Sequence, residues 1–198
     1  MMDAPAIHDF VFPARIARFL KDRAFDPARS ILDLGCGRRK FPGAIGVDSF
    51  PGADADVTHD LNRFPYPFAG GVADLVILRH VIEHLDDVIG TMREIARLLR
   101  PGGHAFILTP HFSDATSWID PTHRWHLATR SIEEATRGLL ELRMRYVKLR
   151  KPWRRLGLES LVNNAPFQAR VPRRIVSWEN DWRFLVRGGE MSCLLERI

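Results

Sequence analysis

Histidines in this chain lie in short segments that also hold carboxylates and hydroxyl groups, a combination suited to proton transfer or metal binding. Residues 78–85 read L-R-H-V-I-E-H-L, residues 109–114 read T-P-H-F-S-D, and residues 120–126 read D-P-T-H-R-W-H. Histidine titrates near neutral pH, so one placed beside a substrate can act as a general base. The irregular spacing gives no firm set of metal ligands, so we predict no metal residues. Backbone hydrogen bonding within loops is the alternative role for these histidines.

A second segment combines an acid with two closely spaced glycines. Residues 31–37 read I-L-D-L-G-C-G, an apolar run that ends at Asp33 and is followed by Gly35 and Gly37. Glycine tolerates positive φ and lets the backbone approach a ligand closely. We therefore expect a buried strand that enters a tight ligand-binding turn. A dinucleotide fingerprint would need a third glycine where Lys40 stands, which argues against a hydride-transfer enzyme.

The apolar and helical patterns predict the elements that hold these segments. Parallel strands are expected at 30–34, 44–47, 55–57, 74–78 and 104–108, helices at 13–23, 88–99 and 131–139, and two late strands at 142–149 and 190–196. The glycine turn should lead into a short turn instead of a long helix, because Pro42 and Gly43 interrupt it. Alternating strands and connections indicate an α/β fold with a doubly wound, mostly parallel sheet.

The carboxyl ends of parallel strands meet at one edge, where such sheets bind their ligands. That edge should bring together one residue from each of five loops: Gly35, Asp48, Asp60, His80 and His111. Five loops that converge on one cleft are stronger evidence for a ligand-binding site than any single motif.

These motifs together resemble the class I S-adenosylmethionine (SAM) dependent methyltransferases, and in particular the type-11 methyltransferase-domain family. The resemblance rests on the acid before Gly-x-Gly, on H-V-I-E-H-L after the fourth strand, and on the T-P-H-F-S and D-P-T-H segments. It covers roughly residues 30–134. It implies a seven-stranded Rossmann-like sheet with an antiparallel C-terminal strand, and SAM as the cofactor.

The resemblance also assigns roles in SAM binding. Asp33 would contact the amino group, Asp48 both ribose hydroxyls, and Asp60 with Leu61 the adenine, while His80 would lie near the methionine moiety. Glu83 and His84 would brace their loop. The implied cofactor-binding residues are Asp33, Gly35, Gly37, Asp48, Asp60, Leu61 and His80.

Methyl transfer is an in-line displacement in which the enzyme aligns the acceptor and removes its proton. His111, which follows the fifth strand, is the first choice of general base, and His126 is the second. A histidine base favours O-methylation. The alternatives are a catalytically silent SAM-binding or partner-binding subunit and, less favoured, a metal-dependent hydrolase that uses the histidine clusters.

Charge is unevenly distributed along the chain. The net charge is +5, yet residues 143–187 alone hold twelve Lys or Arg and three Asp or Glu. Such a field favours an anionic partner, and the alternative is a solvated basic cap. We expect a small, anionic acceptor. A membrane surface or nucleic acid is less favoured, and the Asn/Asp-Pro-Pro-Tyr tetrad of amino-methylating DNA enzymes is absent from the sequence.

The length of 198 residues suits one domain spanning 1–198, with a core at about 30–149 and 189–198 and a basic cap at about 150–188. Only Cys36 and Cys193 are present, so we expect no disulfide framework. Neither a secretory signal nor an apolar run of membrane-spanning length is found. We therefore expect a cytoplasmic location.

Overall fold

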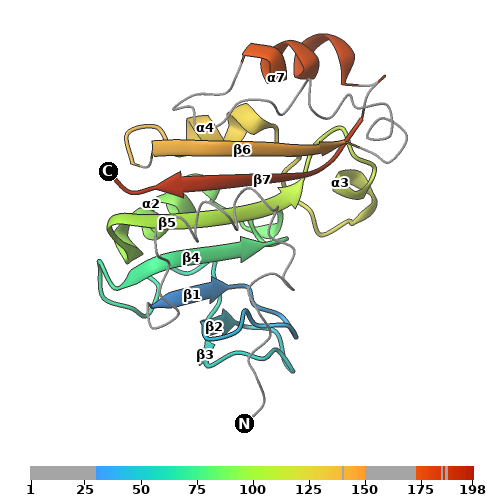
Figure 1. The fold of residues 1–198 in the computed structure, drawn as a ribbon. Helices are drawn as coiled ribbons and strands as arrows, with labels where there is room; N and C mark the ends of the chain where they lie inside the picture. The colour runs from blue at the N-terminus through green and yellow to red at the C-terminus, as the bar shows by residue number, and fades with distance from the viewer. Residues whose placement is uncertain (1–29, 140, 150–172, 184, 186) are drawn as a thin grey trace.

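The computed structural model of the chain describes residues 30–139, 141–149, 173–183, 185 and 187–198 (Figure 1). The helix predicted at 13–23 and most of the predicted basic cap lie outside these ranges. Among the described residues, no helix is long and apolar enough to cross a membrane.

A seven-stranded sheet forms the centre of the fold, in the order β3-β2-β1-β4-β5-β7-β6. Neighbouring strands from β3 to β5 run parallel, and β7 lies antiparallel between β5 and β6. This topology confirms the predicted α/β fold class. The strands are β1 (Ile31–Leu34), β2 (Ile45–Asp48), β3 (Val57–Thr58), β4 (Ala73–Arg79), β5 (Leu99–Pro110), β6 (Glu141–Leu149) and β7 (Gly188–Glu196).

The strand bounds differ most from the prediction at β5, which was expected to begin at His104. The strand begins at Leu99 and continues through the Pro-Gly-Gly segment, where its register against β4 shifts. A shift of this kind is a bulge, which accommodates extra residues in one strand of a pair. Proline and glycine therefore end the preceding helix here without ending the strand.

The described helices are η2 (Ile82–His84), α2 (Val88–Leu98), α3 (Thr116–Ile119), α4 (Thr129–Ala135), α7 (Arg173–Ser177) and the π-helical η3 (Trp178–Trp182). Helix α2 begins where the Asp87 side chain accepts a hydrogen bond from Gly90 N at 2.8 Å, a favourable N-cap. Met92 and Ile95 of α2 pack with Ile132 of α4 in the larger hydrophobic cluster. Both helices thus cover the same face of the sheet.

Helix α4 begins two residues before the predicted start at 131 and ends at Ala135. Ser131 therefore lies within the first turn of the helix. Its Oγ accepts a hydrogen bond from the backbone N of Ala128 at 3.1 Å.

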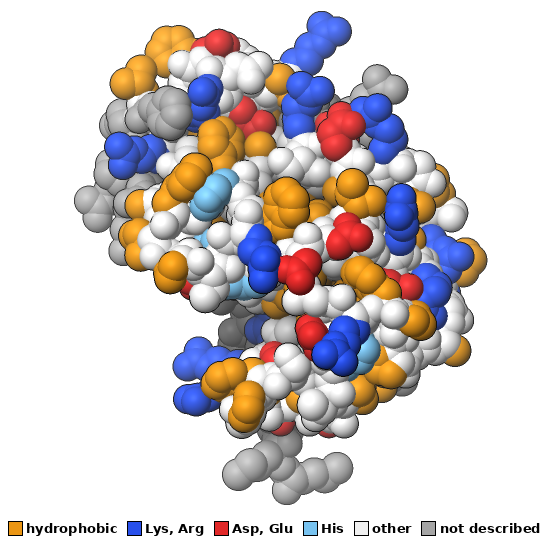
Figure 2. All heavy atoms as spheres, turned by 180° about the vertical axis from the view of Figure 1, so that it is seen from behind, with side chains coloured by type: hydrophobic (Ala, Val, Ile, Leu, Met, Phe, Trp, Pro, Cys, Tyr) orange, Lys and Arg blue, Asp and Glu red, His pale blue; other side chains and the backbone are white. Residues whose placement is uncertain are grey.

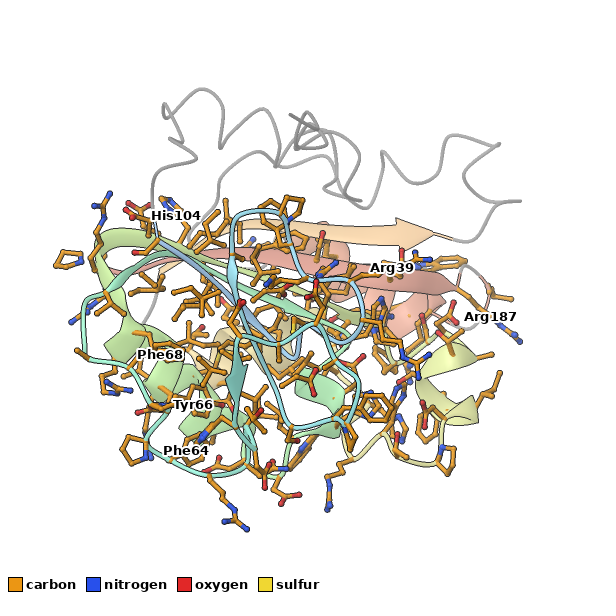
Figure 3. All side chains as sticks on the ribbon, turned by 90° about the horizontal axis from the view of Figure 1, so that it is seen from below. Arg39, Phe64, Tyr66, Phe68, His104 and Arg187 are labelled. Atoms are coloured by element: carbon orange, nitrogen blue, oxygen red, sulfur yellow. The ribbon has the colours of Figure 1, made fainter. Side chains whose placement is uncertain are left out.

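Helix α2 also anchors the loop that follows β3. Tyr66 of this loop is buried, its backbone N donates to Glu94 Oε2 at 2.8 Å, and its hydroxyl donates to Leu61 O at 3.0 Å. Arg97 donates to the carbonyl of Tyr66 and also pairs with Glu94 at 2.7 Å. Figure 3 shows Tyr66 between Phe64 and Phe68 on this loop. These contacts fix the loop segment that begins at Asp60.

On the face of the molecule shown in Figure 2, basic and acidic side chains are interspersed. Much of the basic segment 143–187 lies outside the described residues. The described surface on this face therefore does not present a field of one sign.

Candidate active site

A cavity of about 930 Å³ opens at the carboxyl ends of β1, β2 and β4. This volume falls within the range of roughly 300–1,000 Å³ that is usual for small-molecule sites. The structure describes all nine predicted site residues. Six of them line the cavity: Gly35, Gly37, Asp48, Asp60, Leu61 and His80.

The two glycines form the turn after β1. Gly35 has φ +71° and Gly37 has φ +56°. A Cβ at Gly35 would clash with the side chain of Val81, whereas a Cβ at Gly37 would meet open space. Glycine is therefore favoured at both positions by the positive φ angle. At position 35 it is also required because no Cβ would fit beside Val81.

Asp48 connects the end of β2 to the glycine turn. Its Oδ2 accepts from Gly37 N at 2.8 Å, and its Oδ1 accepts from Phe50 N at 2.8 Å. A carboxylate has about four acceptor positions, so both oxygens can still accept from a ligand hydroxyl. The side chain thus holds the turn in shape and also faces the cavity.

Asp60 and Leu61 occupy the loop after β3. Asp60 Oδ1 accepts from Asn62 N at 3.0 Å, and Oδ2 lies 3.5 Å from Arg63 Nε. Leu61 is buried and packs in the larger hydrophobic cluster. A carboxylate beside a rigid apolar side chain is a suitable surface for a flat ring that carries an amine.

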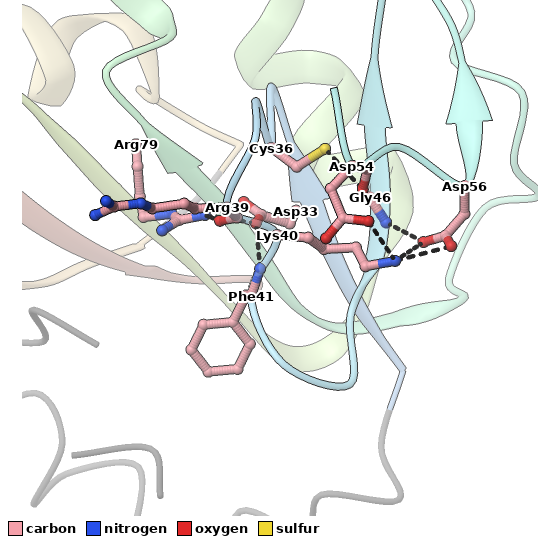
Figure 4. Close-up of polar contacts among 9 residues, drawn as sticks. All are labelled: Asp33, Cys36, Arg39, Lys40, Phe41, Gly46, Asp54, Asp56 and Arg79. Atoms are coloured by element: carbon pink, nitrogen blue, oxygen red, sulfur yellow. Dashed lines mark hydrogen bonds and ion pairs between the residues drawn. The ribbon is translucent and has the colours of Figure 1, made fainter. Parts of the chain in front are cut away.

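Asp33 is not on the cavity wall, although it was predicted to contact the ligand. It is fully buried, and its Oδ2 accepts from Phe41 N and from Arg79 Nη2, both at 2.7 Å (Figure 4). Burial raises the pKa of Asp33, and Arg79 opposes that shift. Arg79 itself lines the cavity and also donates to Arg39 O at 2.6 Å. Arg79, and not Asp33, therefore presents its charge to the cavity.

The short connection between β1 and β2 explains this arrangement. Residues 35–44 form turns, as predicted, so the chain folds back and brings Phe41 N onto Asp33. Lys40 Nζ bonds both oxygens of Asp56 at 2.9 Å, and Asp56 Oδ2 also accepts from Gly46 N at 2.7 Å (Figure 4). These contacts replace the helix that would otherwise support the turn.

Cys36 of the glycine turn is buried, and its Sγ donates to Asp54 O at 3.5 Å. Burial raises the pKa of the Cys36 thiol to about 11. The group therefore stays protonated at neutral pH and is not a nucleophile, because the thiolate is the reactive form.

His80 has the unusual backbone angle φ +55° and lies 44% exposed on the cavity wall. Its Nε2 lies 3.6 Å from Glu190 Oε1 and its Nδ1 lies 3.4 Å from Glu83 Oε1. These two carboxylates, Glu190 first, raise the pKa of His80 to about 9. The imidazole is thus a cation at neutral pH. Left-handed non-glycine residues cost about 1–3 kcal/mol and often mark functional sites.

The structure does not bring His111 into the cavity. The side chain is fully buried, with Nδ1 at 2.8 Å from Ser113 Oγ and Nε2 at 3.0 Å from Glu179 Oε1. Burial alone would raise the pKa of Glu179, but hydrogen bonds from His111 and Thr129 outweigh it and lower that pKa. Both ring nitrogens of His111 are therefore engaged in holding the end of β5 against η3. The role of general base stays a prediction that this geometry does not favour.

His126, the second predicted base, also lies outside the cavity wall. Its ring is exposed and stacks on Trp118 with centroids 3.5 Å apart, and its Nδ1 lies 3.0 Å from Ser117 Oγ. Its catalytic role likewise stays a prediction.

Sequence reasoning missed four charged residues of the wall: Arg38, Arg39, Arg79 and Glu190. Arg79 directly precedes His80, so its place after a buried strand was a usable signal. Glu190 lies in β7, more than eighty residues along the chain from any other cavity residue. No local pattern connects it with them.

Comparison with known proteins identifies the family of the chain. A family model described as a methyltransferase domain matches residues 8–168, and the chain belongs to this family. The match confirms the resemblance to class I SAM-dependent methyltransferases. The matched family is a methyltransferase-domain family other than the type-11 family. No curated protein sequence matches the chain.

Solved structures share the fold. A SAM-dependent methyltransferase from Archaeoglobus fulgidus aligns with TM-score 0.62 and 19% identity over 93% of this chain and 92% of its own. A SAM-dependent methyltransferase from Mesorhizobium loti gives 0.54 and 18% over 91% and 98%. Geranyl diphosphate C-methyltransferase from Streptomyces coelicolor gives 0.58 and 16% over 93% and 79%.

Family and fold together define an enzyme, a SAM-dependent methyltransferase with SAM as its cofactor.

Proposed function

We propose that the enzyme methylates a small acceptor through an oxygen that is already anionic. The observation that carries this proposal is the set of cations on the cavity wall: Arg38, Arg39, Arg79 and the protonated His80. SAM brings only one carboxylate and is otherwise cationic at its sulfonium and ammonium groups. Asp48, Asp60 and Glu190 also line the cavity, Arg79 pairs with the buried Asp33, and His80 lies beside Glu83 and Glu190. Arg38 and Arg39 are wall cations that form no ion pair with a carboxylate among the described residues, and an anionic acceptor would balance them.

In this proposal SAM lies along the three loops that follow β1, β2 and β3. Asp48 accepts from the ribose hydroxyls, and Asp60 with Leu61 holds the adenine. The methionine end lies against the glycine turn, with its carboxylate on Arg79. Support comes from the place of these residues on one continuous wall.

His80 would hold the acceptor anion by charge. At neutral pH it is protonated and cannot remove a proton. An ionised carboxylate, enolate or phenolate needs no base, because its oxygen is already nucleophilic. This requirement favours acidic oxygen acceptors over alcohols. The neighbour from Streptomyces coelicolor, a C-methyltransferase solved with Mg²⁺ and geranyl diphosphate, supports an anionic substrate for a protein of this fold.

A screen tests the proposal directly. Labelled SAM is incubated with the enzyme and with matched pairs of small acids and their amides or alcohols. We expect label transfer to the acids and at least about tenfold less to the uncharged partners. Transfer to uncharged partners alone would refute the anionic acceptor.

A catalytically silent SAM-binding subunit is the second candidate. It is favoured by the burial of His111, which leaves the predicted base outside the cavity. Tight SAM binding by calorimetry, together with label transfer to none of the screened compounds, would favour this candidate.

A further inference from the structure

Two loops beside the cavity bring together a cluster of ligating side chains. Among the described residues, one carboxylate oxygen of Glu83 and one ring nitrogen each of His84 and His123 all lie within 4.8 Å of one another. Glu83 and His84 belong to η2, and His123 belongs to the loop that follows α3. The two ring centroids are 4.6 Å apart. Spacing in the sequence did not reveal this set, because His123 is distant from η2.

The hydrogen bonds of the two histidines assign their protons. His123 Nδ1 lies 3.0 Å from Ser117 O, and a carbonyl can only accept, so Nδ1 carries the proton. His84 Nδ1 lies 3.0 Å from Thr122 Oγ1. That hydroxyl donates its own proton to Asp120 Oδ1 at 2.6 Å and must therefore accept from His84. In the neutral rings both Nε2 atoms consequently carry lone pairs.

Metal-binding histidines are held in this same way, with the second ring nitrogen donating to a carbonyl or another fixed acceptor. The arrangement fixes both the tautomer and the orientation of the ring. Both histidines are held in this way here. His123 Nδ1 donates to a backbone carbonyl, and His84 Nδ1 donates to a hydroxyl that itself donates to a carboxylate.

Negative charge accompanies these lone pairs. Glu83 is buried, its Oε2 accepts from Thr109 Oγ1 at 3.0 Å, and its Oε1 makes no hydrogen bond within the described part of the chain. Asp120 Oδ2 lies 3.9 Å from His123 Nε2. His80 Nδ1 lies 3.4 Å from Glu83 Oε1 on the cavity side. Lone pairs and carboxylates that converge in this way favour a further cation.

We propose that Glu83, His84 and His123 bind one divalent transition metal ion, with zinc as the best match. Two imidazoles and one carboxylate form a known zinc ligand set that leaves a fourth position open. Ligand atoms around tetrahedral zinc lie roughly 3.3 Å apart, as follows from bond lengths of about 2.0 Å. The cluster must therefore contract by about 1–1.5 Å, which side-chain rotation can supply.

The bound ion would fasten the loop after α3 to η2 at the edge of the cavity, since His84 also lines the cavity. This inference does not depend on the identity of the methyl acceptor. The competing explanation is a hydrogen-bonded brace that holds the same loops without metal.

The test is zinc binding by tag-free protein that has been stripped with a chelator. Zinc chloride is titrated in competition with a chromophoric chelator, and cobalt(II) is added separately to report tetrahedral coordination by its visible absorption. We expect one ion per chain with a dissociation constant in the micromolar range or below. No stoichiometric binding would overturn the proposal.

Variants locate the ion. His123→Ala and Glu83→Gln should weaken zinc binding by roughly 100-fold or more. Thr122→Val should weaken it by about 10-fold, because it removes the hydroxyl that orients His84 and leaves only the Thr122 carbonyl, 3.3 Å from Nδ1. Gln keeps the size of Glu and can still accept from Thr109, so it guards against misfolding of the alanine variant. His59→Ala is the control for adventitious histidine binding and should bind as wild type does. Equal affinity in wild type and Glu83→Gln would overturn the assignment.

Discussion

The two halves of the cavity region are built in different ways. Around β1, β2 and β3, carboxylates hold backbone N–H groups: Asp33 accepts from Phe41 N, Asp48 from Gly37 N and Asp56 from Gly46 N. Around β4, β5 and β7, histidines pair with side chains from remote segments, such as His111 with Glu179 and His80 with Glu190. The first half is held by contacts between residues close in the sequence, whereas the second half depends on side-chain pairs that join distant segments.

The largest expected effect concerns His111. His111→Ala should lower the free energy of unfolding by about 3 kcal/mol, because the buried Glu179 carboxylate loses a hydrogen-bond partner. Chemical denaturation measures this loss, and SAM affinity should stay near wild type. If His111 were also the general base, the folded variant would in addition lose roughly 10²–10⁴-fold in rate. His126→Ala, at an exposed histidine that stacks on Trp118, is the control and should cost less than about 1 kcal/mol.

The next effect belongs to the backbone-holding half. Asp48→Ala should weaken SAM binding by about 2 kcal/mol, or roughly 30-fold, since hydrogen bonds to a charged group are lost. Titration calorimetry measures it. Asp54→Ala is the matched control, because its largely exposed carboxylate lies 3.9 Å from Lys40 and outside the cavity wall. Equal SAM affinity in the two variants would contradict the assignment of Asp48.

The glycine turn gives a smaller effect with an internal comparison. Gly37→Ala should cost about 1–2 kcal/mol of stability from its positive φ alone. Gly35→Ala should cost more, because its Cβ would also clash with Val81. Thermal unfolding of both variants checks the order. A reversed order would mean that the turn is free to relax around Gly35.

The contrast between the halves also explains what could be predicted. Gly35, Gly37 and Asp48 serve the backbone next to them, so their residue types and spacing predicted the turn and its place on the cavity wall. The strands and the α/β fold class followed for the same reason, from local apolar patterns, whereas the seven-stranded sheet with an antiparallel C-terminal strand followed from the family resemblance. The histidine roles depend on Glu179 and Glu190, which no spacing rule links to the loops after β4 and β5. The motif predicted that Asp33 contacts the ligand, but the side chain is buried. The short connection between β1 and β2 lets Arg79 and Phe41 cover it.

The smallest expected effect is the pH dependence set by His80. Its pKa is raised to about 9, above the value of about 6.5 for an unfolded chain. The resulting stability is fully present below about pH 6.5 and is lost as pH rises through about 9. The side chain is 44% exposed, so solvent screens the pairs and the loss should stay below about 1 kcal/mol.

The pH dependence of kcat/KM tests the titration of His80 more directly than stability does. If protonated His80 holds the acceptor anion, kcat/KM should fall as pH rises through about 9, and His80→Gln should remove that limb of the profile. A histidine general base predicts the opposite slope, with the rate falling as pH drops through the imidazole pKa. Measuring kcat/KM from pH 6 to pH 10 with an acceptor that stays ionised throughout separates the two. A profile that falls only at low pH, and persists in His80→Gln, would return the role of base to another histidine.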